Sequence, residues 1–209
     1  GNIDIDAADS ININSSKKDG VQANDATVTL NAEDVNINGG AWGIKNFTET
    51  DSKVIINATG DVTIKGEDGA IWTSENGNGE VTVNADGTTV VEGNISANGG
   101  GTVTVGFKGK DSVLKGDVTT EGAAETTLSF EDGATWYADG NAPSNVTELN
   151  MDGGNLDVKN AGADAVTVET LTGTAMNVNV DKLEEATVVV NDEKDDDMKV
   201  SVSTSQQLN

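Results

Sequence analysis

The sequence predicts an all-β chain wound into a three-sided parallel β-helix of about 25 residues per turn, and three observations support this. The segment Val28–Ala32 (VTLNA) returns as Val54–Ala58 (VIINA) and as Val81–Ala85 (VTVNA), after a looser copy at Ile3–Ala7 (IDIDA). Apolar and polar residues alternate within these segments, as in a strand with one buried face. Turns that contain glycine separate the segments, because glycine lets the backbone reverse sharply at little conformational cost.

Three strands are expected in each turn of the coil. The first is the repeated segment, the second is the apolar pair behind it, and the third follows a glycine turn at Gly20–Gln22, Gly43–Lys45 and Ala70–Trp72. The apolar pairs are Ile3/Ile5, Ile11/Ile13, Val28/Leu30, Val35/Ile37, Val54/Ile56, Val62/Ile64, Val81/Val83, Val103/Val105, Leu128/Phe130 and Leu149/Met151. Asn-Gly loops between such pairs also suit antiparallel hairpins. A meander needs no sequence repeat, however, whereas stacked turns share one environment at equivalent positions, so the parallel coil is preferred.

The spacing of the apolar pairs differs between two regions of the chain. Residues 1–160 hold the regular turns, whereas in residues 161–209 apolar pairs come every 10 to 12 residues, at Val166/Val168, Val178/Val180, Val188/Val190 and Val200/Val202. Terminal units of repeat proteins are expected to be atypical because they close the open end of the stack. The second region is therefore interpreted either as continuing turns or as a C-terminal cap of the same domain.

Three asparagines, Asn31, Asn57 and Asn84, occupy one repeat position. Stacked asparagine side chains can hydrogen-bond along the axis as an amide ladder. Each asparagine can instead close only its own turn. The sequence leaves both alternatives open.

The chain of 209 residues has 36 acidic and 12 basic residues and a net charge of −24, without arginine, histidine or cysteine. Phosphate recognition needs a basic surface, so nucleic acid and an anionic membrane are disfavoured as partners. No segment approaches the roughly 20 apolar residues of a membrane helix. The chain begins inside the repeat pattern without a signal peptide, and we therefore expect it to be a piece of a longer protein.

Catalysis is not expected from this composition. Serine–histidine and cysteine–histidine nucleophiles are excluded, and the negative charge would repel a polyuronate. A glycosidase needs only two carboxylates, so a β-helical polysaccharide hydrolase or lyase is the alternative function. No cofactor or metal site is expected, because the glycines at 99–101 and 153–154 do not continue into a calcium-binding nonapeptide. Incidental Ca²⁺ binding by the acidic run 192–197 is compatible with the sequence.

A segment near the C-terminal end carries a family resemblance. Gly133-Ala-Thr-Trp136, followed by Leu149-Asn-Met-Asp-Gly153-Gly154-Asn-Leu156, resembles a recurring pattern in the passenger domains of bacterial autotransporters, of the pertactin-like and self-associating adhesin type. The resemblance covers about residues 130–160 and implies a right-handed parallel β-helix at the cell surface of a Gram-negative bacterium, or secreted from it. It also implies a signal sequence and an outer-membrane β-barrel anchor in the full-length protein, both outside this chain.

Trp42 and Trp72 fall in the third-strand region and are the candidate partner contacts. Exposed rings can stack on a sugar or on a protein partner. Alternatively, the two rings pack inward or cover a corner of a turn. Threonines recur at 27/29 and 102/104 without following one another in successive turns, which disfavours a flat ice-binding face.

The expected function is therefore that of an adhesin or a rigid stalk. Its expected partners are a host surface protein, a host glycan or a second copy of the chain. A negative charge this large makes two rods repel each other, so self-association should strengthen with salt or with calcium.

Overall fold

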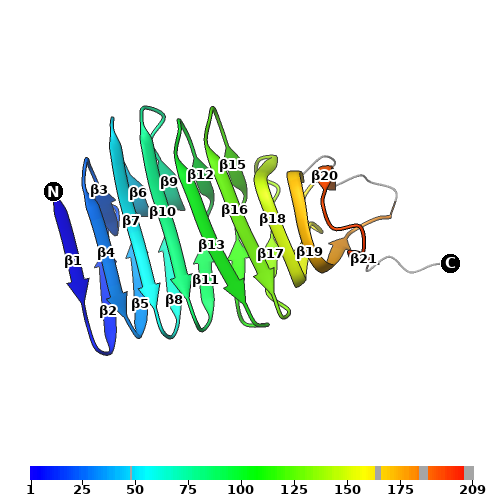
Figure 1. Cartoon of the computed structure of the whole chain (residues 1–209), viewed down its shortest axis with the longest axis horizontal. Coiled ribbons are helices and arrows are strands. Elements are labelled where there is room, and N and C mark those ends of the chain that lie inside the picture. Colours follow the sequence, from blue (N-terminus) through cyan, green and yellow to red (C-terminus); the bar gives the residue numbers. More distant parts are fainter. Residues whose placement is uncertain (48, 163–165, 184–187, 205–209) are drawn as a thin grey trace.

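The computed structural model describes residues 1–47, 49–162, 166–183 and 188–204, and there the chain is a parallel β-solenoid of about eight turns (Figure 1). All described elements of regular structure are strands. Successive turns lie side by side along one axis, with the N-terminus at one end and the last strands at the other (Figure 1). The predicted fold class is confirmed.

Three faces make up each of the first five turns. The first face contains β1 (Asn2–Asp6), β4 (Thr27–Ala32), β7 (Asp51–Ala58), β10 (Asn78–Ala85), β13 (Thr102–Lys108) and β16 (Glu125–Glu131). The second contains β2 (Ser10–Ser15), β5 (Asp34–Gly39), β8 (Val62–Gly66), β11 (Thr89–Glu92), β14 (Val113–Lys115) and β17 (Thr135–Tyr137). The third contains β3 (Val21–Ala23), β6 (Trp42–Asn46), β9 (Gly69–Thr73), β12 (Ile95–Ala97) and β15 (Val118–Thr120).

The chain changes its construction after β15. The long strands β18 (Ser144–Asp157) and β19 (Val166–Val180) each run across the first and second faces, and the described residues beyond β15 hold no third-face strand. The strands β20 (Val188–Glu193) and β21 (Lys199–Thr204) pair in parallel with the two halves of β19. The described part of residues 161–209 thus continues the parallel stacking; positions 163–165, 184–187 and 205–209 lie outside the described residues.

Parallel pairing between equivalent positions holds the turns together. Thr27 pairs with Lys53 and Lys53 with Glu80, steps of 26 and 27 residues. Glu80 pairs with Thr102 and Thr102 with Glu125, steps of only 22 and 23 residues. The period of about 25 residues therefore describes the first turns alone, and it shortens well before residue 160.

Inward side chains form continuous apolar columns. One column on the first face consists of Leu30, Ile56, Val83, Val105, Leu128, Leu149 and Leu171, and each of these is at most 2% exposed. Burying one such side chain contributes about 1.5–3 kcal/mol, and stacking makes each turn complete its neighbour's core. At the ends of the solenoid inward positions are open, with Ile5 40% exposed at the start of this column and Val202 of the last strand 56% exposed, because a terminal turn has a neighbour on one side only.

The corner after each first-face strand has two designs. In the first turns the last inward residue is an alanine, at Ala32, Ala58 and Ala85. In later turns it is Phe107 or Phe130, both fully buried with their rings stacked 4.6 Å apart. Both kinds of corner lie beside the site described below.

Threonines on the outer side of the first face do follow one another. Thr82 pairs with Thr104, and Thr104 pairs with Thr127. The expectation that threonines are not stacked in successive turns is wrong for these three, because the shorter period after β10 brings them into register. The column is interrupted by Ile55 before it and by Glu148 after it.

Candidate functional site

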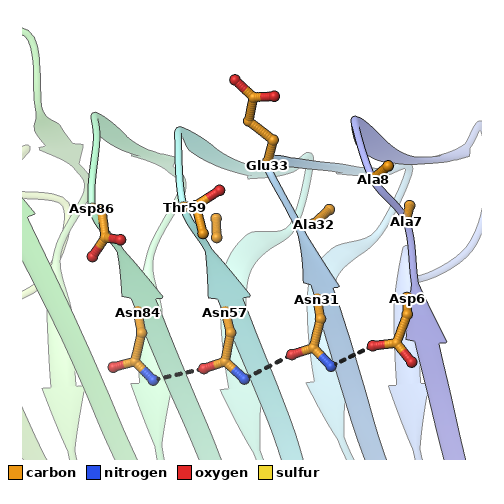
Figure 2. A pocket seen from close by; sticks show the side chains of 11 residues that line it. Asp6, Ala7, Ala8, Asn31, Ala32, Glu33, Asn57, Thr59, Asn84 and Asp86 are labelled. Atoms are coloured by element: carbon orange, nitrogen blue, oxygen red, sulfur yellow. Dashed lines mark hydrogen bonds between the residues drawn. The ribbon is translucent and has the colours of Figure 1, made fainter.

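An amide ladder runs along the outer side of the first face (Figure 2). Asn84 Nδ2 donates to Asn57 Oδ1 at 3.0 Å, and Asn57 Nδ2 donates to Asn31 Oδ1 at 2.9 Å. Asn31 Nδ2 then donates to the carboxylate of Asp6 at 2.7 Å. The ladder alternative is therefore confirmed, with Asp6 as a fourth member. Each bond polarises the next, and ending the chain on a carboxylate strengthens it because charge-assisted hydrogen bonds are stronger.

The ladder forms the floor of a groove of about 720 Å³ that runs across β1, β4, β7 and β10. Small residues at the corners, among them Ala7 and Ala32, line its wall, while Glu33 and Asp86 stand at the turns (Figure 2). Inward and outward side chains alternate along β4, β7 and β10, so Asn31, Asn57 and Asn84, which each follow an inward residue, face this groove. The groove is thus polar on its floor and acidic at its edge.

A second, shorter set of hydrogen bonds between asparagine side chains lies on the second face. Asn36 Nδ2 donates to Asn12 Oδ1 at 3.0 Å, and Asn38 Nδ2 donates to Asn14 Oδ1 at 3.1 Å. Sequence reasoning missed this ladder. Its signal was present in the alternation Ile11-Asn-Ile13-Asn against Val35-Asn-Ile37-Asn, which pair in register.

An aromatic patch lies on the outside of the third face, and it consists of Lys45, Phe47 and Trp72. The rings of Phe47 and Trp72 stack with centroids 6.2 Å apart, and Lys45 Nζ lies 5.1 Å from the centroid of the Trp72 ring. Phe47 is 42% exposed, and Trp72 and Lys45 are partly exposed. A stacked aromatic pair of this kind contributes about 0.5–1.5 kcal/mol beyond its burial, and the cation adds about 0.5–1 kcal/mol at an exposed site.

The two tryptophans singled out in the sequence have different surroundings. Trp42 pairs with Gly69 of the next turn, and its ring covers that glycine so closely that a Cβ there would clash with the ring. Trp72 lies on the outer side between Lys45 and Ser96, beside Phe47. The structure therefore does not bring Trp42 and Trp72 into one stacked pair. Phe47 and Lys45 were not recognised, because the contacts that join them to Trp72 lie between turns.

A buried carboxylate organises the turn where the third face ends. Asp117 is 1% exposed and accepts hydrogen bonds from the backbone N–H of Gly140 at 3.0 Å and of Ala142 at 3.1 Å. Partial burial, and then the negative charge of Asp117, raise the pKa of the neighbouring Asp139 above its ordinary value of 3.8. Because the Asp117 carboxylate is satisfied by backbone donors, its role here is to hold the segment that replaces the missing strand.

Metal-binding and membrane features can be stated for the described residues. No group of three or more acidic side chains there is arranged to hold a metal ion, and the acidic run 192–197 uses Asp195 to accept the N–H of Gly173 at 2.6 Å. None of the described elements is a helix long and apolar enough to cross a membrane.

Comparisons of this chain with protein-family models, with curated proteins and with solved structures find no match. The surfaces described above therefore carry the functional conclusion.

Proposed function

We propose that this chain is an adhesive rod displayed on a cell surface, which binds a protein partner through the aromatic patch. The observation that carries the proposal is the outward stack of Phe47 and Trp72 beneath Lys45. The chain has only seven aromatic residues, and Phe107, Phe130 and Trp136 are fully buried in the core. An exposed stacked pair contributes little to the core, whereas aromatic residues with a polar surround are typical of the centre of a protein interface.

The surroundings of the patch favour a protein partner. Along the third face the outer positions beside Trp72 are Lys45 and then Ser96 and Thr119, which are polar. The lysine places a positive charge on a molecule whose net charge is −24, so it can pair with a carboxylate that the rest of the surface would repel. A rod of stacked turns about 4.8 Å apart holds this surface in a fixed orientation along its length.

Placement at the surface of a Gram-negative bacterium, as an autotransporter passenger, is part of the same proposal. Its support is the resemblance at residues 130–160 together with a fold of stacked parallel turns. A downstream outer-membrane anchor in the complete reading frame would support this placement, and a full-length protein without an export signal would contradict it.

Binding of the fluorescently labelled chain to cultured epithelial cells tests the adhesive function. Flow cytometry should detect binding that disappears when the cells are first treated with trypsin. Trp72→Ala and Phe47→Ala should each weaken binding at least about tenfold, as expected for residues at the centre of an interface. Tyr137→Ala is the matched control, since Tyr137 is a 39% exposed ring on the second face. Binding that survives trypsin, or is unchanged in both patch variants, would overturn the proposal.

Self-association is a separate outcome of the same study. If the protein partner is a second copy, sedimentation velocity should show dimers that increase from low to high salt, because screening reduces repulsion between two highly negative rods. Trp72→Ala should then abolish these dimers. A monomer at every ionic strength rules out this form of the proposal.

A further inference from the structure

The groove over the amide ladder extends farther than the ladder itself. A second hollow of about 320 Å³ is lined by Val105, Gly106 and Ser129, and it shares Asn84 and Asp86 with the first. The two hollows therefore form one groove across β1, β4, β7, β10, β13 and β16. Five steps between these strands amount to ~24 Å along the axis of the solenoid. The shape suits an extended ligand lying along the axis.

Unused hydrogen-bonding groups recur along this floor at the spacing of the turns. A primary amide has two N–H donors and an oxygen with two lone pairs, and the ladder uses one donor and one lone pair of Asn31 and of Asn57. Each of these residues therefore retains one donor and one acceptor for a ligand. Within the described part of the chain, no hydrogen bond reaches Asn84 Oδ1 or the Ser129 hydroxyl.

Gly106 makes a notch in the column of outward side chains. Gly106 pairs with Ser129, and it occupies the position equivalent to Asn84 in the next turn. An asparagine at position 106 would therefore continue the ladder. The backbone of Gly106 lies outside the left-handed region, and a Cβ would approach only Ser129 Oγ, at 3.2 Å. The backbone conformation therefore does not require glycine at this position. The effect of glycine is to leave space between two unused polar groups, Asn84 Oδ1 and Ser129 Oγ.

We propose that this groove binds an extended chain of neutral sugar residues, with one hydroxyl group seated in the notch at Gly106. A hydroxyl both donates and accepts, which matches the one donor and one acceptor left on each ladder amide. The alanine corners offer a small apolar wall to the C–H faces of the rings. Asp6, Glu33 and Asp86 make the groove acidic, and they repel a polyanionic chain. This site is separate from the aromatic patch and does not depend on the proposed adhesive function.

The groove also fits a neutral glycan better than it fits a peptide strand. A peptide strand adds to an open sheet edge through its backbone. Here the strands beneath the groove are paired on both sides, except for β1 at the end, so their backbone groups are already bonded. The floor of the groove presents side-chain amides and hydroxyls in place of free backbone groups, and these can reach ring hydroxyls at successive turns.

Calorimetric titration of the whole chain with neutral oligosaccharides tests the proposal. The probes are cello-, xylo-, manno- and chito-oligosaccharides, each from the disaccharide to the hexasaccharide, with oligogalacturonate as the acidic comparison. At least one neutral series should bind, with affinity that rises with chain length and then levels off, and oligogalacturonate should not bind. Asn57→Ala and Gly106→Asn should each lower the affinity about tenfold, since each removes one or two hydrogen bonds to the ligand.

Two variants distinguish loss of the binding site from unfolding of the chain. Gly106→Asn fills the notch and extends the ladder, so it should melt at or above the wild-type temperature while it binds more weakly. Asn36→Ala removes the same kind of bond on the second face and should bind as the wild type does. Wild-type affinity in both groove variants, failure of every neutral series to bind, or tighter binding of oligogalacturonate would each overturn the proposal.

Discussion

The corner after the first-face strand is built from different residues in the first turns and in the later turns of this solenoid. In the first, alanine lies inside the corner and a hydrogen-bonded asparagine outside it, as with Ala58 and Asn57. In the later turns a stacked phenylalanine fills the inside, and the outer position is Gly106 or Ser129. The groove runs over corners of both designs, with asparagine in its floor at the first and glycine or serine at the second, and only the second design adds an aromatic core. The difference indicates that the later turns contribute more to stability, while turns of both designs present polar groups to the groove.

Truncating the phenylalanine corner should have the largest effect on stability. Phe130 is fully buried, stacks on Phe107 at 4.6 Å and lies 6.3 Å from the Trp136 ring. Phe130→Ala should lower the free energy of unfolding by about 3–5 kcal/mol, because it removes transfer free energy and leaves a cavity. Urea unfolding followed by circular dichroism measures this. A loss below about 1 kcal/mol would mean that the stack does not stabilise these turns.

Placing a phenylalanine at an alanine corner of the first turns should lower the stability of the chain. Ala58 is 5% exposed between Ala32 and the following turn, where the inward space is already filled. Ala58→Phe should cost about 1–3 kcal/mol through overpacking. The same urea experiment checks it, with Ala8→Phe at an exposed position as the control. An increase in stability would show that the first corners hold unused internal space.

Breaking the ladder should matter less. Asn57 makes two ladder bonds on an exposed surface, and each is worth about 0.5–1 kcal/mol at most. Asn57→Ala should lower the midpoint of urea unfolding by an amount equivalent to about 1 kcal/mol. Asn38→Ala removes a single bond and should cost about half as much. Equal losses in both variants would contradict the expectation that each ladder bond contributes to stability.

The smallest predicted effect concerns the corner that replaces the third face. The pKa of Asp139 is raised in the folded state, so the native chain binds the proton more tightly than the unfolded chain does. Stability from this group is therefore full at low pH and falls as pH rises from about 3.8 through the raised pKa. Asp139→Asn should slightly stabilise the chain at pH 7 and lose that advantage in acid. Thermal melting of both proteins from pH 3 to pH 8 checks the sign, and destabilisation at neutral pH contradicts it.

Much of the fold followed from short-range patterns that repeat. The period of Val28, Val54 and Val81 predicted stacked turns, and the third strands at Ile44 and Ile71 were located correctly. The ladder could be anticipated because Asn31, Asn57 and Asn84 share one repeat position. The shortening after β10 was missed, because Thr102 begins a turn that has lost the Asn-Ala signature.

By itself, the sequence determined the coil, the inward residues and the row of asparagines, since alternation and periodicity act within and between neighbouring strands. Only the tertiary structure decided that Lys45 and Phe47 meet Trp72 and that Gly106 opens a notch beside Ser129. These contacts depend on the register between turns. That register is set by how each loop closes and how the core packs, and no local pattern encodes it.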